Sequence, residues 1–476
     1  MPGLIFQRSD GIVWRALSDR VLVHRVGASP GEAAAELSGP VALIWLALDE
    51  PASVAEICRR LAEASVTVDD PEAELERLRG AGLVEASDPG PGGGPPAFVG
   101  HLSVYDTTVR GGCPRAAPDR ADHWRLGPMT PLERAVFAAG IPLPEVSSGH
   151  RHVAADPESF RSLLRWAADE RLTGLLCQAI GDGSIALDTP SGSSLADEVH
   201  EAHRTLVRHS LGAEATAIEV IELLAEDGIV AYPFKGVANA HLDYPDPALR
   251  TFLDADLHVE RPRFGDAITA LLAAGYTRTS VPLGERWERQ FARACELRAP
   301  NGVEVDLHAS VATGFFGTIL DDDALRAGPE TIELAGRTLP AFSLPARALI
   351  SCYSIVLSRG PGLRLQRDLA QQLVAMASDW PRMIDLAGRD GEVVVARSLD
   401  TVASMFGPAL LEPDALDWAS TVTPTKSARR ALELADRAHD TGWSADARST
   451  MLALDPTDTA RYLGGIAIGR LRRLRR

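Results

Sequence analysis

Apolar and polar residues alternate at the start of the chain and then recur at helical spacing. Between residues 12 and 26 the alternation has a period of two, which predicts short β-strands. Three helices are predicted after it, one along the apolar run 41–48, one over 54–61 and one that begins at Pro71. Residues 82–84 predict a closing edge strand. The first 87 residues are therefore interpreted as a small α/β domain.

A Gly- and Pro-rich stretch over residues 88–96 ends this first domain. Pro lacks a backbone N–H and Gly has a high backbone entropy, so the stretch cannot sustain a helix or a sheet. Residues 101–150 show no strong periodicity, and only a short helix is predicted there, near Pro131. We interpret residues 88–155 as a linker with an irregular segment.

Longer helical patterns and a few strands make up the rest. Helices predicted over 157–180 and 195–227 precede apolar strands at 229–234 and around Asp254. Asn301-Gly302 between two alternating runs predicts a β-hairpin. Beyond Leu344 the pattern is helical, with breaks marked by Pro. The fold class predicted is α/β (α+β): a small winged-helix-like domain at 1–87, a mixed-sheet core with N-terminal helices at 156–343, and a helical C-terminal subdomain at 344–476.

Composition excludes several classes of partner. A net charge of −17 over 476 residues argues against broad electrostatic binding to DNA or RNA. The 5 cysteines are scattered without CxxC spacing, which indicates neither a disulfide framework nor a zinc site. No apolar run approaches the length of a membrane span, and the start lacks a basic leader followed by an apolar core. We expect a cytoplasmic protein without DNA or membrane partners; the oligomeric state does not follow from the sequence.

Several carboxylates fall on the strand-like runs. Alternate side chains of a strand share a face, so Asp254 and Asp256 point together and repel each other. Mg²⁺ or Mn²⁺ would relieve this repulsion and bridge the pair to a nucleoside triphosphate. Glu304, Asp306 and His308 also share a face, so periodicity does not choose between Glu304 and Asp306. We favour Asp306, as a metal ligand or as a general base near an attacking hydroxyl.

Candidate phosphate-binding residues come shortly before these strands. Lys235-Gly236 follows an apolar strand and precedes a helical stretch, whose first amides could receive phosphate oxygens. Arg250 has two open roles, since it could clamp phosphate or fix the loop through a carboxylate. His258 shares the face of Asp254 and Asp256 and is either solvated or hydrogen-bonded, or else has a catalytic or base-stacking role. His258, His308 and Glu304 are kept as accessory candidates.

In these residues the segment from about Asp156 to Gly391 resembles an uncharacterised nucleotidyltransferase family of the polymerase-β-like superfamily that occurs in bacterial peptide gene clusters. The resemblance rests on Lys235-Gly236, Tyr244-Pro-Asp-Pro, Arg250, Asp254-Ala-Asp256, Val305-Asp306-Leu-His308 and, more loosely, Arg364-Leu-Gln-Arg-Asp368. It implies that Asp254, Asp256 and Asp306 bind metal and that an NTP, with ATP expected, donates a nucleoside monophosphate. The chain departs from the family pattern at Ala255, His258 and Ala309.

Residues 12 to about 86 resemble the PqqD-like domain, the recognition element of ribosomal peptide (RiPP) biosynthesis. The resemblance rests on residues such as Val13-Trp-Arg15, Leu37-Ser-Gly-Pro40 and Ala81-Gly-Leu-Val84. It implies that the leader of a precursor peptide binds by β-augmentation beside the sheet and rests on the third helix. The residues expected to hold the leader are Arg20, Val21, Leu22, Val23, Leu75 and Leu78. A plain winged-helix structural module is the alternative.

Together these observations predict a metal-dependent nucleotidyltransferase that modifies a leader-bound precursor peptide. Tethering the leader raises the effective concentration of the acceptor, so leader binding need not be tight. Two alternatives stay open. The acceptor could be a small molecule, a protein or tRNA, or the chain could be a peptide-binding scaffold without catalysis.

Overall fold

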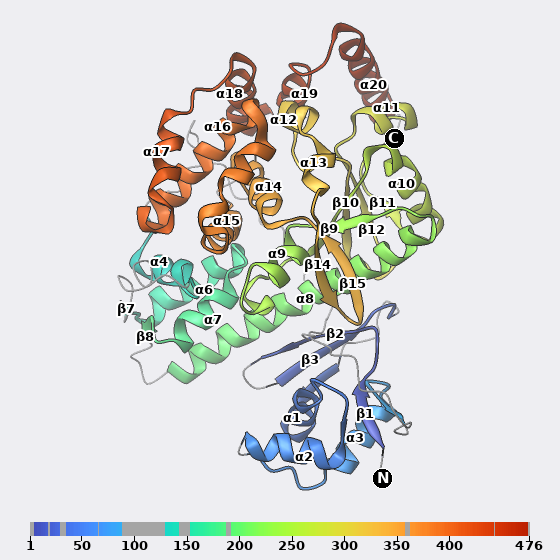
Figure 1. Cartoon of the computed structure of the whole chain (residues 1–476), viewed down its shortest axis with the longest axis vertical. Helices are drawn as coiled ribbons and strands as arrows, with labels where there is room; N and C mark the ends of the chain where they lie inside the picture. Colours follow the sequence, from blue (N-terminus) through green and yellow to red (C-terminus); the bar gives the residue numbers. More distant parts are fainter. Residues whose placement is uncertain are drawn as a thin grey trace.

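The computed structural model describes residues 4–17, 20–28, 35–64, 66–87, 129–141, 153–186, 192–357, 362–441 and 443–474. The fold is mixed α/β, with a small N-terminal part, a central mixed sheet and a helical C-terminal part (Figure 1). The expected linker lies mostly outside the described residues, but the helix expected near Pro131 is present as α4 (Pro131–Ala138). Within the described residues, no helix combines the length and apolar character that crossing a membrane requires.

Two small sheets and three helices form the N-terminal part. Polar side chains cap two of the helices, since Ser53 accepts a hydrogen bond from the Glu56 N–H and Asp70 accepts one from the Ala73 N–H. The strand orders are β5-β1-β6 and β2-β3-β4. The elements are β1 (Ile5–Arg8), β2 (Ile12–Ala16), β3 (Arg20–Arg25), β4 (Ala35–Ser38), α1 (Gly39–Ala47), β5 (Ala52–Ser53), α2 (Val54–Glu63), α3 (Pro71–Gly80) and β6 (Val84–Ser87).

The expected leader-binding edge is wrong, because β3 is the central strand of its sheet. It pairs antiparallel with β2 on one side and with β4 on the other. No backbone edge is left for a peptide along Arg20, Val21, Leu22 and Val23, and Leu75 and Leu78 are buried in the core. An alternating pattern identifies a strand but not its neighbours, and β4 is too short and too exposed to give a clear pattern. Among the described strands of this sheet, β4 is the more exposed edge.

The central sheet has the order β11-β12-β13-β10-β9. β10 runs parallel to β13 and antiparallel to β9, and β12 and β13 form the predicted hairpin. Gly302 takes a φ of 92° in the hairpin turn, which explains the Asn-Gly pair. The strands are β9 (Ala231–Pro233), β10 (Asp254–Val259), β11 (Thr277–Arg278), β12 (Ala294–Arg298) and β13 (Glu304–His308).

Helices pack around this sheet. The long helix α8 (Gly192–Glu226) contacts β9, β10 and β13, and it also contacts β2 and β3 of the N-terminal part (Figure 1). The other elements up to residue 341 are β7 (Val153–Ala154), α6 (Pro157–Asp169), α7 (Thr173–Gly181), β8 (Ile185–Ala186), α9 (Gly236–Leu242), η2 (Pro247–Leu249), η3 (Arg261–Arg263), α10 (Phe264–Ala273), α11 (Glu285–Phe291), α12 (Gly314–Ile319), α13 (Asp322–Arg326), β14 (Glu330–Leu334) and β15 (Arg337–Ala341).

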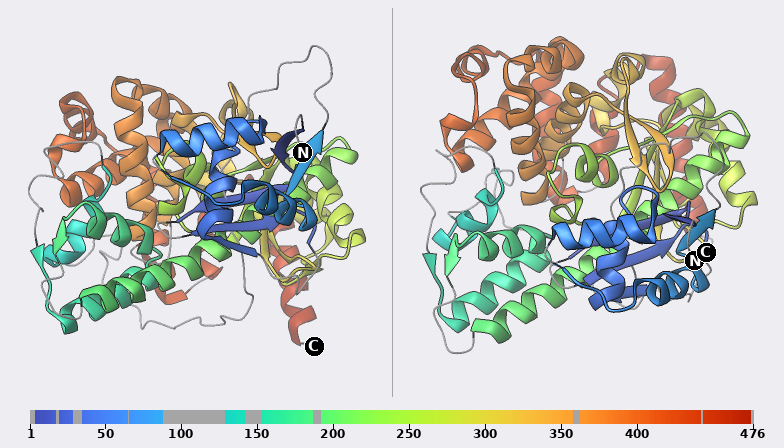
Figure 2. Two further views of the ribbon diagram at one scale, coloured as in Figure 1. Left: turned by 90° about the horizontal axis from the view of Figure 1, so that it is seen from below. Right: turned by 60° about the horizontal axis from the view of Figure 1, so that its bottom comes forward.

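Beyond residue 343 the described chain is helical, as the sequence predicts. Its helices lie on the side of the central sheet away from the N-terminal part (Figures 1 and 2). They are α14 (Leu344–Leu357), α15 (Leu363–Met376), η4 (Ala377–Asp379), α16 (Pro381–Phe406), η5 (Pro408–Leu410), α17 (Pro413–Thr421), α18 (Lys426–Thr441), α19 (Trp443–Thr450) and α20 (Pro456–Leu474).

A buried polar cluster joins the N-terminal part to the core. Arg15 of β2 forms an ion pair with Glu214 of α8, and both side chains are almost fully buried. The Nε2 atom of His241, in α9, lies 3.1 Å from Glu214 Oε1 and 3.2 Å from the Arg15 guanidinium. Removing one partner of a buried pair leaves an uncompensated charge, so this cluster fixes the N-terminal part against the core.

Candidate active site

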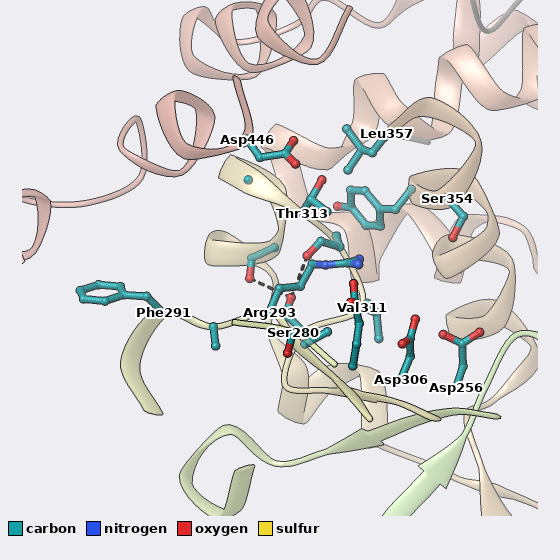
Figure 3. Close-up of a pocket in the computed structure, with 18 of the residues that line it drawn as sticks. Asp256, Ser280, Phe291, Arg293, Asp306, Val311, Thr313, Ser354, Leu357 and Asp446 are labelled. Atoms are coloured by element: carbon teal, nitrogen blue, oxygen red, sulfur yellow. Dashed lines mark hydrogen bonds between the residues drawn. The ribbon is translucent and has the colours of Figure 1, made fainter. Parts of the chain in front are cut away.

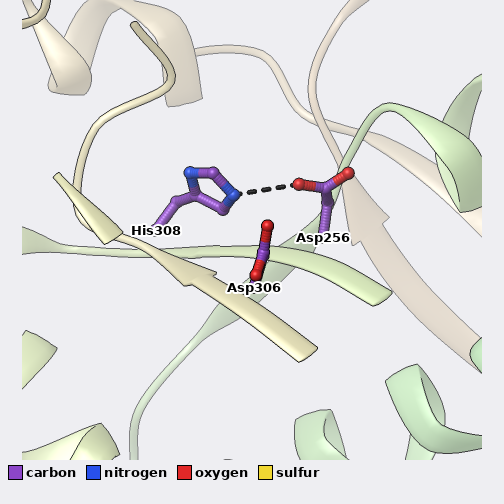
Figure 4. Close-up of side chains that lie close together, drawn as sticks. All are labelled: Asp256, Asp306 and His308. Atoms are coloured by element: carbon purple, nitrogen blue, oxygen red, sulfur yellow. Dashed lines mark hydrogen bonds and ion pairs between the residues drawn. The ribbon is translucent and has the colours of Figure 1, made fainter. Parts of the chain in front are cut away.

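Parallel pairing of β10 and β13 brings the predicted carboxylates together. The register places Asp254 beside Glu304, Asp256 beside Asp306, and His258 beside His308. Residues in register on adjacent strands project from the same face of a sheet. Asp254, Asp256 and Asp306 all line one pocket, which has a volume of about 1070 Å³. Figure 4 shows Asp256, Asp306 and His308 side by side.

Lys235 lies next to these carboxylates. It adopts a φ of 51° between β9 and α9, and its Nζ donates to Asp256 Oδ1 over 2.6 Å. Gly236 follows it, in close contact with Phe252. A Cβ added at Gly236 would lie 2.7 Å from Phe252 Cγ, so this position requires glycine for packing.

Replacing Gly236 by Ala should therefore destabilise the fold by about 1–3 kcal/mol, because the buried Phe252 ring has to move. The free energy of unfolding in urea measures this. Gly265→Ala is the matched control, since a methyl group added to that helical glycine would have no atom within 4 Å. There alanine should be neutral or stabilising by up to about 1 kcal/mol. Equal effects at both glycines would contradict the packing role.

His308 supports Asp256 from the neighbouring strand. Its Nε2 lies 2.9 Å from Asp256 Oδ1, and the side chain is fully buried. Burial and the nearby Lys235 ammonium lower the pKa of His308 to about 3, so the imidazole is neutral near pH 7. Burial alone would raise the pKa of Asp256, but Lys235 and His308 outweigh burial and hold that pKa well below its usual range. Asp256 is thus ionised throughout the physiological range.

Asp306 has the opposite environment. Burial, followed by repulsion from Asp256 and Asp254, raises the pKa of Asp306 to about 7. One carboxylate of the group is thus fully charged, whereas another holds its proton near neutrality. The two paired carboxylates, Asp256 and Asp306, thus differ in charge state at neutral pH.

This raised pKa predicts a pH dependence of stability in the metal-free chain. Between pH 4 and pH 7 the folded chain keeps a proton on Asp306 that the unfolded chain has lost, so stability falls as pH rises through this window. From pH 5 to pH 8, Asp306→Asn should gain more than about 1 kcal/mol of unfolding free energy relative to wild type. Urea denaturation in EDTA measures the difference. A constant difference across this range would contradict the raised pKa, and Glu304→Gln should follow the wild type.

The donor set fits a divalent cation. One ligand atom each from Asp256, Asp306 and His308 lies within 4.8 Å of the others. Carboxylate oxygens are the ligands that Mg²⁺ and Mn²⁺ prefer, and a neutral imidazole nitrogen also suits Mn²⁺. Asp254 lines the same pocket. A cation bound here would offset the repulsion from Asp256 and Asp254 that adds to burial in raising the pKa of Asp306.

Two accessory candidates lie away from this donor set. Glu304 is exposed and forms an ion pair with Arg298 over 2.9 Å, so the geometry favours Asp306 over Glu304. His258 is fully buried and packs against the Phe342 ring, with centroids 5.5 Å apart. Its Nε2 lies 3.7 Å from Asp322 Oδ1 and has no hydrogen-bond partner among the described residues. The sequence predicted a solvated or hydrogen-bonded histidine as one alternative, but among the described residues His258 is neither. Its ring is instead packed in the interior, against Phe342.

Arg250 takes the second of its two predicted roles. Its Nε and Nη2 donate to the two carboxylate oxygens of Asp368 over 2.7 and 2.8 Å, and Nη1 donates to the Thr251 carbonyl. Tyr244 and Asn239 also donate to Asp368. Arg250 borders the pocket, but these contacts occupy its guanidinium, so it holds the loop before β10 rather than clamping phosphate.

The pocket also contains two arginines for which the sequence predicted no role. Arg293 and Arg364 line it together with the carboxylates, and Figure 3 shows the Arg293 side chain extending into the pocket above Asp306. Arg364 belongs to the loosely matched segment that also contains Asp368. Arg293 stands just before β12, and no motif marks it, because only the folded sheet brings it beside Asp306.

Among known proteins, a family model matches about half of the chain. The family described as "Uncharacterised nucleotidyltransferase" matches residues 156–398, just over half of the chain. The crystal structure of an antigenic nucleotidyltransferase-like protein from Paracoccidioides brasiliensis is similar over 45% of this chain and 95% of its own, with 18% sequence identity and a TM-score of 0.29. No curated protein matches the sequence.

Proposed function

The chain belongs to the uncharacterised nucleotidyltransferase family, and from this premise we propose that it transfers a nucleoside monophosphate from an NTP to an acceptor. The observation that carries the proposal is the register of β10 and β13, which places Asp256 beside Asp306 with Lys235 in contact. Family membership implies an NTP substrate and a divalent metal; ATP and Mg²⁺ or Mn²⁺ are the proposed pair.

In the proposed reaction an acceptor oxygen forms a bond to the α-phosphorus, the bond from that phosphorus to the bridging oxygen breaks, and pyrophosphate leaves. Lys235 would contact the phosphates from its place at the start of α9. The acceptor proton would pass to the Asp306 carboxylate. His308 acts as a positioning residue, since its hydrogen bond orients Asp256. A metal at Asp254, Asp256 and Asp306 would neutralise charge on the phosphates.

We further propose that residues 1–87 form a PqqD-like recognition element that presents a precursor peptide to the core at 156–343, with the helices from 344 onward completing the pocket. Two features support this. The small domain has three helices beside two sheets, and β4 is an edge among the described strands with three of its four residues exposed, which makes it the edge proposed for β-augmentation. The buried Arg15–Glu214 pair holds the domain against α8 at the back of the central sheet.

The test combines the full chain with a short candidate precursor peptide, Mg²⁺ or Mn²⁺, and each NTP in turn. Mass spectrometry should find a peptide heavier by one nucleotidyl group. No such product with any NTP would contradict a peptide acceptor. Transfer of the nucleotidyl group to a small molecule, a protein or tRNA instead would support nucleotidyl transfer but reject the peptide as its acceptor.

A further inference from the structure

The pocket extends well beyond the carboxylates, to a group of three aromatic side chains that we call the aromatic wall. It consists of Trp287 and Phe291 of α11 and Tyr462 of α20. Trp287 and Tyr462 stack with centroids 5.4 Å apart, and Phe291 meets Tyr462 edge to face at 5.3 Å. An aromatic surface at the end of a polar, acid-lined pocket suits a flat apolar group of a ligand.

Two contacts hold Trp287 of the wall against α20. Trp287 Nε1 donates to the Tyr462 carbonyl over 2.9 Å. Gly465 of α20 lets the helix approach, because a Cβ there would lie only 2.0 Å from Trp287 Cδ1. The indole is therefore fixed in orientation before any ligand arrives, which lowers the entropic cost of binding.

The order of strands separates Lys235 from the wall. Lys235 follows β9, the strand at one edge of the sheet, and Asp306 lies on β13, the middle strand. Arg293 and α11 lie toward β12 and β11, at the opposite edge. In an in-line displacement the acceptor approaches the α-phosphorus opposite the departing pyrophosphate. With the phosphates at Lys235, the acceptor comes from the side of Arg293 and the wall.

The nucleoside has separate room. Tyr353 and Leu357 of α14 and Leu365 of α15 line another part of the pocket, together with Arg364. Figure 3 shows Leu357 and Ser354 on the side of Asp256, whereas Phe291 lies at the opposite side with Arg293 between them. Two regions of the pocket are thus separate, one beside the carboxylates and one beyond Arg293, as a reaction with two substrates requires.

Charge near the wall is compatible with this assignment. Arg278 forms two hydrogen bonds of 2.9 Å with Glu288, so its guanidinium is already paired. Arg293 makes no side-chain hydrogen bond or ion pair with any described residue, and it stands between the wall and Asp306. A cation at that point favours the attacking oxygen of the acceptor as it loses its proton.

We propose that the aromatic wall is the acceptor subsite and that the acceptor carries an aromatic ring close to its attacking oxygen. This assignment rests on the proposed nucleotidyl transfer. In a peptide acceptor, the ring would belong to the modified residue or to its neighbour.

The experiment uses the full chain and two small probes, N-acetyl-tyrosinamide and N-acetyl-serinamide, titrated in saturation-transfer NMR. Wild type should bind the tyrosine probe roughly two- to tenfold more tightly than the serine probe, as stacking on an aromatic surface predicts. Trp287→Leu should remove this preference. Trp418→Leu is the matched control, because Trp418 pairs with Trp380 in the C-terminal helices and does not line the pocket. Phe291→Leu keeps apolar volume and tests the wall if Trp287→Leu fails to fold.

Binding of α,β-methylene NTP analogues with Mg²⁺ separates the two proposals. Trp287→Leu should leave analogue binding within twofold of wild type. Loss of analogue binding in Trp287→Leu would overturn the inference, because the wall would then hold the nucleobase. Equal binding of the two probes to wild type would also overturn it. Failure of the proposed function would look different, since wild type itself would bind no analogue, and the acceptor assignment would fall with it.

Discussion

Replacing Asp256 by Asn is expected to weaken Mn²⁺ binding by roughly a hundredfold, since losing one ligand or its support costs at least about 10- to 100-fold in affinity. The Asp256 carboxylate is ionised, and both Lys235 Nζ and His308 Nε2 lie within hydrogen-bond distance of its Oδ1 atom. The amide of Asn carries no charge to offset that of the cation. Free Mn²⁺ measured by electron paramagnetic resonance during a titration gives the affinity directly, without knowledge of the acceptor.

Glu304→Gln is the control for this loss. It also removes one carboxylate, from β13, the strand that pairs with the strand of Asp256. Glu304 is exposed and paired with Arg298, outside the donor set. Its substitution should change the Mn²⁺ affinity by less than about twofold, as expected for a screened surface charge. Equal losses in the two variants would mean that general negative charge, rather than this site, attracts the cation.

Asp368→Asn is expected to lower the free energy of unfolding by about 3–5 kcal/mol, the usual cost of breaking a buried ion pair. Asp368 and Arg250 are 0% and 4% exposed at their side chains, and the pair ties α15 to the loop before β10. An Asn amide cannot accept from Arg250 at both positions, which leaves the guanidinium buried and uncompensated. Urea denaturation followed by circular dichroism measures the change.

The control is a surface pair in the same helical region. Asp379 and Arg382 lie 3.4 Å apart with side chains 53% and 68% exposed. Asp379→Asn should change stability by less than about 0.5 kcal/mol. If Asp368→Asn lowered the free energy of unfolding no more than Asp379→Asn does, the Arg250–Asp368 pair would not stabilise the fold. Phosphate binding would then again be an open role for Arg250.

The sequence predicted the strands that carry the site because each has a strong local signal. Alternation marks β10, and Asn301-Gly302 marks the hairpin that brings Asp306. Alternation does not encode which strands become neighbours. The parallel pairing of β10 with β13 joins residues 50 positions apart in the chain, and it alone determines that Asp256, rather than Asp254, faces Asp306.

The same limit explains the misplaced peptide edge. β3 has the apolar alternation of a strand, but its central place depends on β4, which has four residues and only one buried side chain. Arg250 shows a related limit. Its residue type suits phosphate and carboxylate equally, and the choice depends on Asp368, 118 residues away in the chain. Arg293 has no local signal at all.

Calorimetric titration with α,β-methylene analogues of the four NTPs tests the central claim most directly. Wild type should bind at least one analogue when Mg²⁺ or Mn²⁺ is present and lose it in EDTA, and the double variant Asp254→Asn/Asp256→Asn should bind none. Equal binding by that variant, or no binding by wild type, would contradict the assignment and favour a peptide-binding scaffold without catalysis.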